Sequence, residues 1–313
     1  MKKIATREAY GNTLAEIGKQ NENIVVLDAD LSKSTKTAVF KGECPERFLN
    51  MGIAEGNMMT VAAGLATCGK IPFASTFAIF AAGRAFEQIR NSIAYPKLNV
   101  KVCATHAGIT VGEDGASHQA IEDISLMRSI PNMVVICPSD AVEASATVKA
   151  VAEYNGPCYV RLGRLGVNVI NDNDDYKFEI GKAVQLRDGN EVAIIATGMM
   201  VDAALEAYNT LAEEGIKARV INIHTIKPID EDAIAAAARD CGVIITAEEH
   251  SVIGGLGSAV SEVVTSTYPV SVIKVGINDT FGESGSPNEL LEKYGLTADE
   301  IVKSVKKALQ LKK

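Results

Sequence analysis

The sequence lacks the features that would suit it to a nucleic acid or to a membrane. Its 31 Lys and Arg against 39 Asp and Glu leave a net charge of −8, which argues against neutralisation of a nucleic-acid backbone or an anionic bilayer. No stretch approaches the ~18 uncharged apolar residues that a membrane span needs, and no apolar segment follows the two N-terminal lysines. We therefore expect a cytoplasmic protein with neither a nucleic-acid nor a membrane partner.

The cysteines form no recognisable site. Six are scattered along the chain without a single C-x-x-C pair, so the sequence shows neither a zinc knuckle nor a redox dithiol, and we predict no metal ligands. Several of them sit in or beside runs rich in Val and Ile. We expect most of them to be buried small hydrophobic side chains of a protein from a reducing compartment.

Composition and length indicate a globular protein of two domains. Hydrophobic residues make up 47% and charged residues 22% of the 313, close to globular averages, which excludes disordered and fibrous classes. Short apolar runs alternate with longer segments of helical period, the pattern of an α/β fold with mostly parallel sheets. In the first half of the chain, this pattern predicts strands at 24–28, 71–74, 100–105, 134–137 and 158–162. It predicts helices there at 6–19, 55–67, 84–95, 119–129 and 140–153.

A change of composition marks a linker between the two domains. Residues 168–190 are rich in Asn and Asp and have no long apolar period, so we predict a linker with one hairpin between a domain at 1–167 and a smaller α/β domain at 191–313. In the second domain, the same alternation predicts strands at 192–197, 218–222, 243–247 and 272–275 and helices at 202–214, 230–239, 256–267 and 298–311.

Ligands of α/β sheets bind outside the carboxyl ends of the strands, so polar residues after predicted strands are the first candidates. Acids and hydroxyls at 28–34 follow the first strand and suit either a site or a helix cap. Glu55, among Met, Ile and Ala, suits either a helix start or a desolvated acid for proton transfer. Phe77 and Phe80 suit either core packing or an aromatic wall against a flat ring.

The loop at 105–119 carries the densest group of reactive side chains. It holds two of the four histidines, His106 and His118, together with Glu113 and Asp114. A long polar loop directly after a buried strand is usually functional. The spacing of the two histidines is not one that metal sites use, so sugar or phosphate recognition and proton transfer outrank metal binding.

Two further features have structural as well as functional interpretations. The glycine-rich stretch 254–257 lacks the full G-x-G-x-x-G spacing, so close helix–strand packing outranks a nucleotide phosphate site there. Arg161 and Arg164 follow a predicted strand, where they suit either surface charges or a phosphate clamp.

Together these segments resemble the transketolase family of thiamine diphosphate enzymes. The resemblance rests on 75–77, 84–90, 112–115, 128–132 and 138–140, which match the family's pyrimidine-binding domain in order and spacing, while the chain from Val192 onward is similar to its C-terminal domain. It implies a thiamine-diphosphate pyrimidine-binding fold followed by a transketolase C-terminal domain. The segment between Phe80 and Arg84 is one residue longer here than in some relatives.

The resemblance implies roles around the cofactor. Glu55 matches the carboxylic acid that protonates the aminopyrimidine ring, and Phe77 and Phe80 match the aromatic pocket that holds this ring. Asp30 lies where the family has an acid near the cofactor. The apolar neighbours of Glu55 suit such an acid, since burial keeps a carboxyl sharing its proton near neutral pH.

It also implies roles around a phosphorylated sugar. Asp114 matches the residue that orients a substrate hydroxyl, and His118 one that contacts the reacting oxygens of the donor, which makes His118 catalytic as well as substrate-binding. An arginine fork suits a dianionic phosphate. The residues that match the family's phosphate group are Arg7, Ser34, His106 and Arg164.

One family feature is missing, and it implies a partner chain. The family holds the diphosphate and Mg²⁺ in an N-terminal domain that opens with Gly-Asp-Gly, a string that this sequence lacks. The resemblance therefore implies the C-terminal subunit of a split transketolase of the pentose phosphate pathway. Thiamine diphosphate and Mg²⁺ would be shared with an N-terminal subunit, with self-association into an α2β2 heterotetramer.

Other interpretations stay open at this point. A deoxyxylulose-phosphate synthase-like subunit or the beta subunit of a 2-oxo acid dehydrogenase would share the fold and Glu55, although His106, Asp114 and His118 favour phosphorylated sugars. A non-catalytic nucleotide-binding module that uses residues 254–257 is the alternative from another class.

Overall fold

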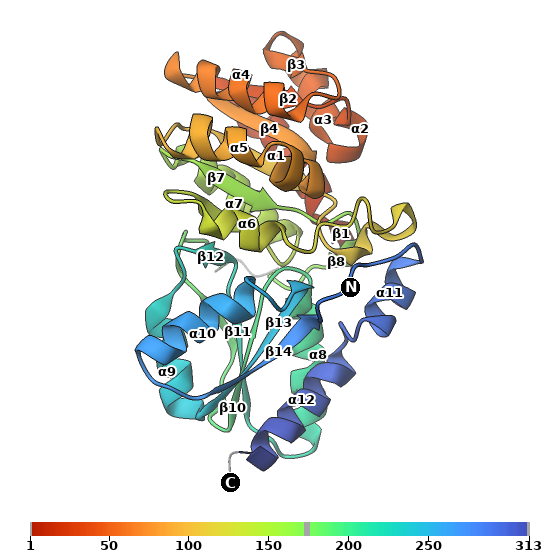
Figure 1. Cartoon of the computed structure of the whole chain (residues 1–313), viewed down its shortest axis with the longest axis vertical. Coiled ribbons are helices and arrows are strands. Elements are labelled where there is room, and N and C mark those ends of the chain that lie inside the picture. Colours follow the sequence, from red (N-terminus) through yellow and green to blue (C-terminus); the bar gives the residue numbers. More distant parts are fainter. Residues whose placement is uncertain (1, 172–175, 312–313) are drawn as a thin grey trace.

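The computed structural model describes residues 2–171 and 176–311, which form two α/β parts stacked along the long axis of the molecule (Figure 1). The first part is built on a seven-stranded sheet in the order β12-β6-β7-β5-β4-β2-β3, parallel except for β12 at one edge. Its strands are β2 (Ile24–Asp28), β3 (Phe48–Asn50), β4 (Ile71–Phe77), β5 (Lys101–Thr105), β6 (Val134–Ile136), β7 (Cys158–Arg161) and β12 (Thr225–Lys227).

The second part is built on a five-stranded sheet in the order β14-β13-β10-β11-β9, parallel except for β9. The two sheets confirm the predicted α/β class with mostly parallel strands. The strands of the second sheet are β9 (Val184–Arg187), β10 (Val192–Ala196), β11 (Ala218–Asn222), β13 (Val243–Ser251) and β14 (Ser271–Ile277), and a separate antiparallel pair joins β1 (Lys3–Ala5) to β8 (Gly166–Asn168).

Helices cover both faces of the first sheet, because its strands are apolar on both sides. In β2, Ile24 and Val26 pack into the cluster with α1, α3 and α7, whereas Val25 and Leu27 face the cluster with α4. The helical segments of this part are α1 (Thr6–Gln20), α2 (Ser32–Thr35), α3 (Thr37–Glu43), η1 (Pro45–Arg47), α4 (Glu55–Thr67), η2 (Phe80–Arg84), α5 (Phe86–Gln88), η3 (Ile89–Ala94), η4 (Ile109–Asp114), α6 (Asp123–Ser129) and α7 (Ala141–Glu153).

Two helices begin where an aspartate side chain accepts a backbone N–H of the first turn. The Asp140 carboxylate accepts the backbone N–H of Glu143 at 2.8 Å, which confirms the predicted start of α7. Asp230 caps α9 in the same way through Ala233 at 3.1 Å. The helices of the second part are α8 (Met200–Glu213), α9 (Glu231–Cys241), α10 (Leu256–Ser266), α11 (Pro287–Lys293) and α12 (Ala298–Leu311).

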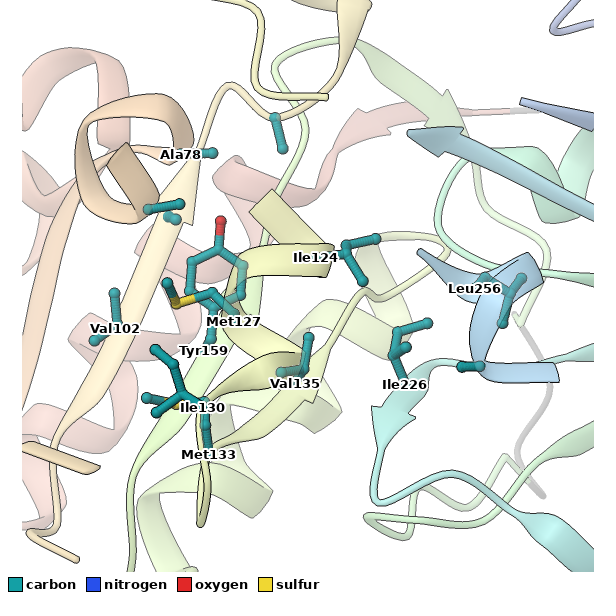
Figure 2. Packing of buried hydrophobic residues seen from close by; sticks show 14 of the residues in the cluster. Ala78, Val102, Ile124, Met127, Ile130, Met133, Val135, Tyr159, Ile226 and Leu256 are labelled. Atoms are coloured by element: carbon teal, nitrogen blue, oxygen red, sulfur yellow. The ribbon is translucent and has the colours of Figure 1, made fainter. Parts of the chain in front are cut away.

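One hydrophobic cluster continues from the first part into the second. Figure 2 shows Ile124 and Met127 of α6 in the same packed cluster as Ile226 of β12 and Leu256 of α10. Strand β12 belongs to the second half of the sequence but pairs antiparallel with β6 of the first sheet. The two parts therefore share buried apolar surface, and burial of this kind is worth roughly 25 cal/mol per Å².

The predicted hairpin in the linker is wrong for the part of 168–190 that the structure describes. Strand β8, at the start of this segment, pairs with β1, and β9 pairs with β11 rather than with a neighbour along the chain. Residues 172–175 of the predicted linker lie outside the described residues. Composition carried no information about which distant strand supplies the hydrogen bonds.

Two predicted helices differ in detail. The helix predicted at 119–129 begins only at Asp123, because the Gln119 amide donates to the backbone carbonyls of Ile109 and Glu283, at 3.1 and 2.9 Å. The helix predicted at 84–95 is interrupted by π turns, one of which is closed by the Ala85 N–H donating to the Phe80 carbonyl at 3.3 Å. Such turns widen a helix locally and are frequent at functional sites. Short elements such as α2, α3, β3 and α11 escaped the sequence analysis because none has a long period.

Candidate active site

The candidate site is centred on His106, directly after β5. This residue adopts a left-handed backbone conformation, with φ +58°, and its ring is 3% exposed. The ring stacks on Phe77 at the end of β4, with the centroids 3.8 Å apart. Because β4 and β5 are parallel neighbours, their carboxyl ends bring these two rings together.

The hydrogen bonds of His106 assign its tautomer. Nη1 of Arg7 lies 3.3 Å from Nε2, and since a guanidinium can only donate, Nε2 is the acceptor. The ring proton then lies on Nδ1, which faces the Thr105 hydroxyl at 2.9 Å. Burial, together with the positive charges of Arg7 and Arg164, lowers the pKa of His106 to about 3. The ring is therefore a neutral acceptor at physiological pH.

Two arginines stand beside this ring. Arg7, in the first turn of α1, also donates to the backbone carbonyl of Ser34 at 2.8 Å, which brings Ser34 beside it. Arg164, after β7, donates to Glu113 at 2.9 Å and to the carbonyl of Val111. Burial and the nearby Arg164 lower the pKa of Arg7, as expected for two cations held close together. The structure thus brings together all four residues predicted around a phosphate.

Aromatic contacts extend the site towards the carboxyl end of β4. Phe77 and Phe80 are stacked at 5.8 Å with an interplanar angle of 16°. The ring of His118, which is half-buried, meets Phe80 edge-on at 5.4 Å, and its Nδ1 lies 3.0 Å from the Ser117 hydroxyl. The predicted aromatic pair and both predicted histidines therefore form one group.

Glu55 joins this group through an arginine that the sequence analysis missed. It is the first residue of α4, and its side chain is 5% exposed. Arg84 lies 3.2 Å from its carboxylate and 4.0 Å from the centroid of the Phe80 ring. The setting of Glu55 is therefore not purely apolar, as the neighbouring Met, Ile and Ala had indicated. No sequence pattern linked the two residues, which are 29 positions apart.

Asp30 and Asp114 stand at the edge of this set of contacts. Asp114 is exposed at the end of η4, whereas the exposed Asp30 accepts a hydrogen bond from the Asn50 amide at 2.8 Å. The acid that the fold buries after β2 is Asp28, which accepts from the hydroxyls of Thr35 and Thr37 at 2.7 and 2.9 Å. Burial raises the pKa of Asp28. Asp28 thereby fixes the turn that presents the Ser34 carbonyl to Arg7.

Arg161 is not part of a phosphate clamp. Its side chain is 5% exposed and donates from Nε to both oxygens of Asp123, at 3.1 and 2.9 Å. Burial opposes its charge, but Asp123, Cys137 and Glu249 together outweigh burial, so the pKa of Arg161 is raised. Asp123 also accepts from the Tyr159 hydroxyl at 2.7 Å. Of the two arginines suggested as a clamp, only Arg164 reaches the site.

The glycine-rich stretch 254–257 is already filled from within the protein. The carboxylate of Glu248 accepts the N–H groups of Leu256 and Gly257, at 2.6 and 2.8 Å, and so occupies the anion position at the start of α10. A Cβ atom on Gly255 would lie 2.0 Å from this carboxylate. The close-packing interpretation of these glycines is confirmed, and a phosphate would have to displace a buried side chain.

The cysteines and the membrane expectation can also be compared with the structure. Cys44, Cys103, Cys137, Cys158 and Cys241 are buried and Cys68 is exposed, which confirms that most of them are core side chains. Within residues 2–171 and 176–311, no helix has both the length and the apolar character to cross a membrane. Over the same ranges, no three His, Cys, Asp or Glu side chains gather as a metal site.

Comparison with known families decides the relationship. The family model for the transketolase pyrimidine-binding domain matches residues 2–168, and that for the transketolase C-terminal domain matches residues 181–301. The chain belongs to the transketolase family. The predicted resemblance is thereby confirmed.

Similar transketolases include proteins made of separate subunits. A solved structure described as a split gene transketolase, inactive beta4 tetramer, is 61% identical, with a TM-score of 0.92 over 99% of this chain and 100% of that one. The chain is 44% identical to the 6-deoxy-6-sulfo-D-fructose transketolase subunit of Clostridium sp. strain MSTE9, over 98% of this chain and 95% of the relative. A Methanocaldococcus jannaschii protein, whose name marks it as a candidate transketolase C-terminal section, is 55% identical over 96% of this chain and 94% of its own length.

Single-chain members of the family are about twice as long. Human transketolase is 39% identical over 97% of this chain, but the match covers only 49% of the human protein. This chain therefore corresponds to the pyrimidine-binding and C-terminal domains of the family and spans about half the length of human transketolase.

Proposed function

We propose that this chain is the C-terminal subunit of a two-chain transketolase that moves a two-carbon ketol unit between phosphorylated sugars. The observation that carries the proposal is the continuous set of contacts from Glu55 through Arg84, Phe80 and Phe77 to His106. It puts a buried acid, a pair of aromatic rings and a buried histidine that contacts Arg7 in one place, as carbon–carbon bond transfer on a sugar phosphate needs.

The residues present fit the pyrimidine end of thiamine diphosphate. The rings of Phe77 and Phe80 are nearly parallel, with an interplanar angle of 16°, and form an aromatic pair suited to a flat heterocycle. Glu55 is buried beside them and can hold a proton at a ring nitrogen. Thiamine diphosphate, when bound, supplies the nucleophile and the electron sink of the reaction, and the protein supplies orientation and proton transfer.

The rest of the site would come from a partner subunit. We propose that the N-terminal subunit holds the diphosphate and Mg²⁺ and that the two chains assemble as α2β2. The exposed side chain of Ile53 supports a missing neighbour, because this large aliphatic group is 77% exposed only two residues before Glu55. The half-length match to human transketolase supports the same division of the enzyme.

The cationic pocket supports an anionic sugar as substrate. Arg7 and Arg164 lie beside the neutral His106, and two guanidinium groups suit an oxyanion with several acceptor oxygens. We propose that Asp114 orients a substrate hydroxyl and that His118 contacts the reacting oxygens. The pocket chemistry suits a phosphate or a sulfonate, and the name of the Clostridium relative places a sulfo sugar among the family's substrates.

Reconstitution tests the division between subunits. The chain alone, and the chain mixed with its N-terminal partner, would be assayed with xylulose 5-phosphate and ribose 5-phosphate in the presence of thiamine diphosphate and Mg²⁺. We expect turnover only in the mixture. Turnover by the purified chain alone would disprove the need for a second subunit.

Assays with alternative substrates distinguish transketolase from the other thiamine diphosphate reactions. The same mixture would be offered pyruvate, either alone or with glyceraldehyde 3-phosphate, and 6-deoxy-6-sulfo-D-fructose as a donor. We expect activity with an anionic ketose and none with pyruvate, since a 2-oxo acid has no phosphate for Arg7 and Arg164 to bind. A preference for pyruvate would favour a 2-oxo acid dehydrogenase or a deoxyxylulose-phosphate synthase-like enzyme instead.

A further inference from the structure

The second domain reaches into the loop that carries Asp114 and His118. Glu249, near the end of β13, accepts the backbone N–H of Thr110 at 2.8 Å, and its side chain is 5% exposed. A Cβ atom on Gly108, which has φ +80°, would lie 2.2 Å from the Glu249 carboxyl carbon. The carboxylate thus fills the space that a side chain on the loop would otherwise take.

The base of the same loop is fixed around Arg161. Nη2 of this buried guanidinium donates to the backbone carbonyls of Ala120 and Glu249, at 3.2 and 2.9 Å. Asp123, at the start of α6, accepts from its Nε. The Ser251 N–H adds a backbone hydrogen bond to the Ile121 carbonyl at 2.8 Å. The last residues of β13 are therefore held against the segment that follows the loop, Glu249 through Arg161 and Ser251 through its own hydrogen bond to Ile121.

The far side of the loop also rests on the second domain. The Gln119 amide donates to the Glu283 carbonyl at 2.9 Å, and α11 packs against η4 (Figure 1). A Cβ atom on Gly115 would lie 2.5 Å from the Ser284 hydroxyl. Among these contacts, the Glu249 carboxyl group is the buried side-chain acceptor for a backbone N–H inside the loop. A buried donor left without its acceptor is costly.

We propose that Glu249 is a positioning residue, through which the C-terminal domain holds the substrate loop 106–119 in the geometry that places Asp114 and His118. The inference rests on the proposed function for the roles of those two side chains, but the anchor itself can be measured without any substrate. It gives the C-terminal domain a task in the reaction, exerted through the loop that carries Asp114 and His118.

Hydrogen–deuterium exchange of the full chain tests the anchor directly. In Glu249→Ala, the Thr110 amide loses its buried acceptor, and we expect its exchange, with that of the loop peptide 106–119, to speed up by about ten- to a hundredfold. The peptide covering α4 should not change. Glu249→Gln keeps an oxygen at the acceptor position and should restore most of the protection, which separates positioning from a general loss of fold.

A matched control removes a different contact between the same two domains. Glu262→Gln breaks the ion pair of Glu262 with Arg128, at 3.1 and 2.7 Å, which involves no residue of the loop and in which the Glu262 side chain is exposed. We expect it to leave exchange of the loop peptide unchanged. Unchanged exchange at Thr110 in Glu249→Ala, or an equal effect of Glu262→Gln, would overturn the anchor.

Kinetics of the reconstituted enzyme test the link to substrate. We expect Glu249→Ala to raise the KM for the phosphorylated sugar and to lower kcat/KM by about tenfold or more, since small displacements of positioned groups are costly. The affinity for thiamine diphosphate should stay at the wild-type value. Faster loop exchange with wild-type KM and kcat/KM would overturn the positioning role. An inactive wild-type complex would instead overturn the proposed function and leave the exchange result standing.

Discussion

The neutral, buried His106 makes the stability of the chain depend on pH in a predictable direction. In the folded protein, burial and then the charges of Arg7 and Arg164 hold the pKa of His106 at about 3, whereas an unfolded histidine has a pKa of about 6.5. The unfolded state therefore takes up a proton first as the pH falls. The contribution of His106 to stability is fully present above pH ~6.5 and declines below it until the pH reaches about 3.

The size of the effect follows from this difference. At pH 5, about 1.5 pH units below the unfolded pKa, linkage predicts a loss of about 2 kcal/mol, at 1.36 kcal/mol per pH unit. For a chain of 313 residues with an unfolding entropy of ~2.1 cal/mol/K per residue, this corresponds to a fall in Tm of about 3 °C.

His106→Asn isolates this contribution, because asparagine tolerates the left-handed backbone at this position and does not titrate. Calorimetric Tm values would be measured for the wild type and the variant at pH 7.5 and pH 5.0. We expect the wild type to lose about 3 °C more than the variant. Equal losses, or an NMR titration in which the His106 ring protonates near pH 6.5, would refute the assigned neutral tautomer and its burial.

Three further substitutions test the acid, the buried ion pair and the glycine-rich turn. Glu55→Gln should lower turnover of the reconstituted enzyme by about a hundredfold or more while size-exclusion chromatography shows unchanged assembly, and near-normal turnover would exclude a proton-transfer role. Asp123→Asn leaves a buried guanidinium without its counter-ion and should cost about 3–5 kcal/mol, or about 5–8 °C in Tm, whereas a loss below 1 °C would contradict a buried pair. Gly255→Ala drives a methyl group into Glu248 and should lower the free energy of unfolding by about 1–3 kcal/mol. The control Gly64→Ala has open space at its Cβ and should be neutral or stabilising. Equal Tm values for the two variants would argue against the filled turn.

Much of the fold could be predicted, because buried parallel strands and their helices leave a local signature. The run Ile24–Asp28 is apolar on both faces and became β2 with the predicted bounds, and α4 likewise spans Glu55–Thr67. Partners could not be predicted in this way. Strand β12 crosses to the sheet of the other domain, and β9 leaves the predicted linker to extend the second sheet. Such pairing depends on contacts between distant segments, which periodicity does not record.

The same distinction between local pattern and distant contacts applies to the candidate site. The sequence by itself determined the kinds of residue that follow the strands: an acid at Glu55, rings at Phe77 and Phe80, and histidines at His106 and His118. Only the tertiary structure decided their states and partners. It paired Glu55 with Arg84, turned the Arg161 side chain inward onto Asp123, and placed Glu249 of the second domain against the loop at 105–119. Residue type is a local property, whereas burial and charge pairing arise only once distant strands and helices have packed together.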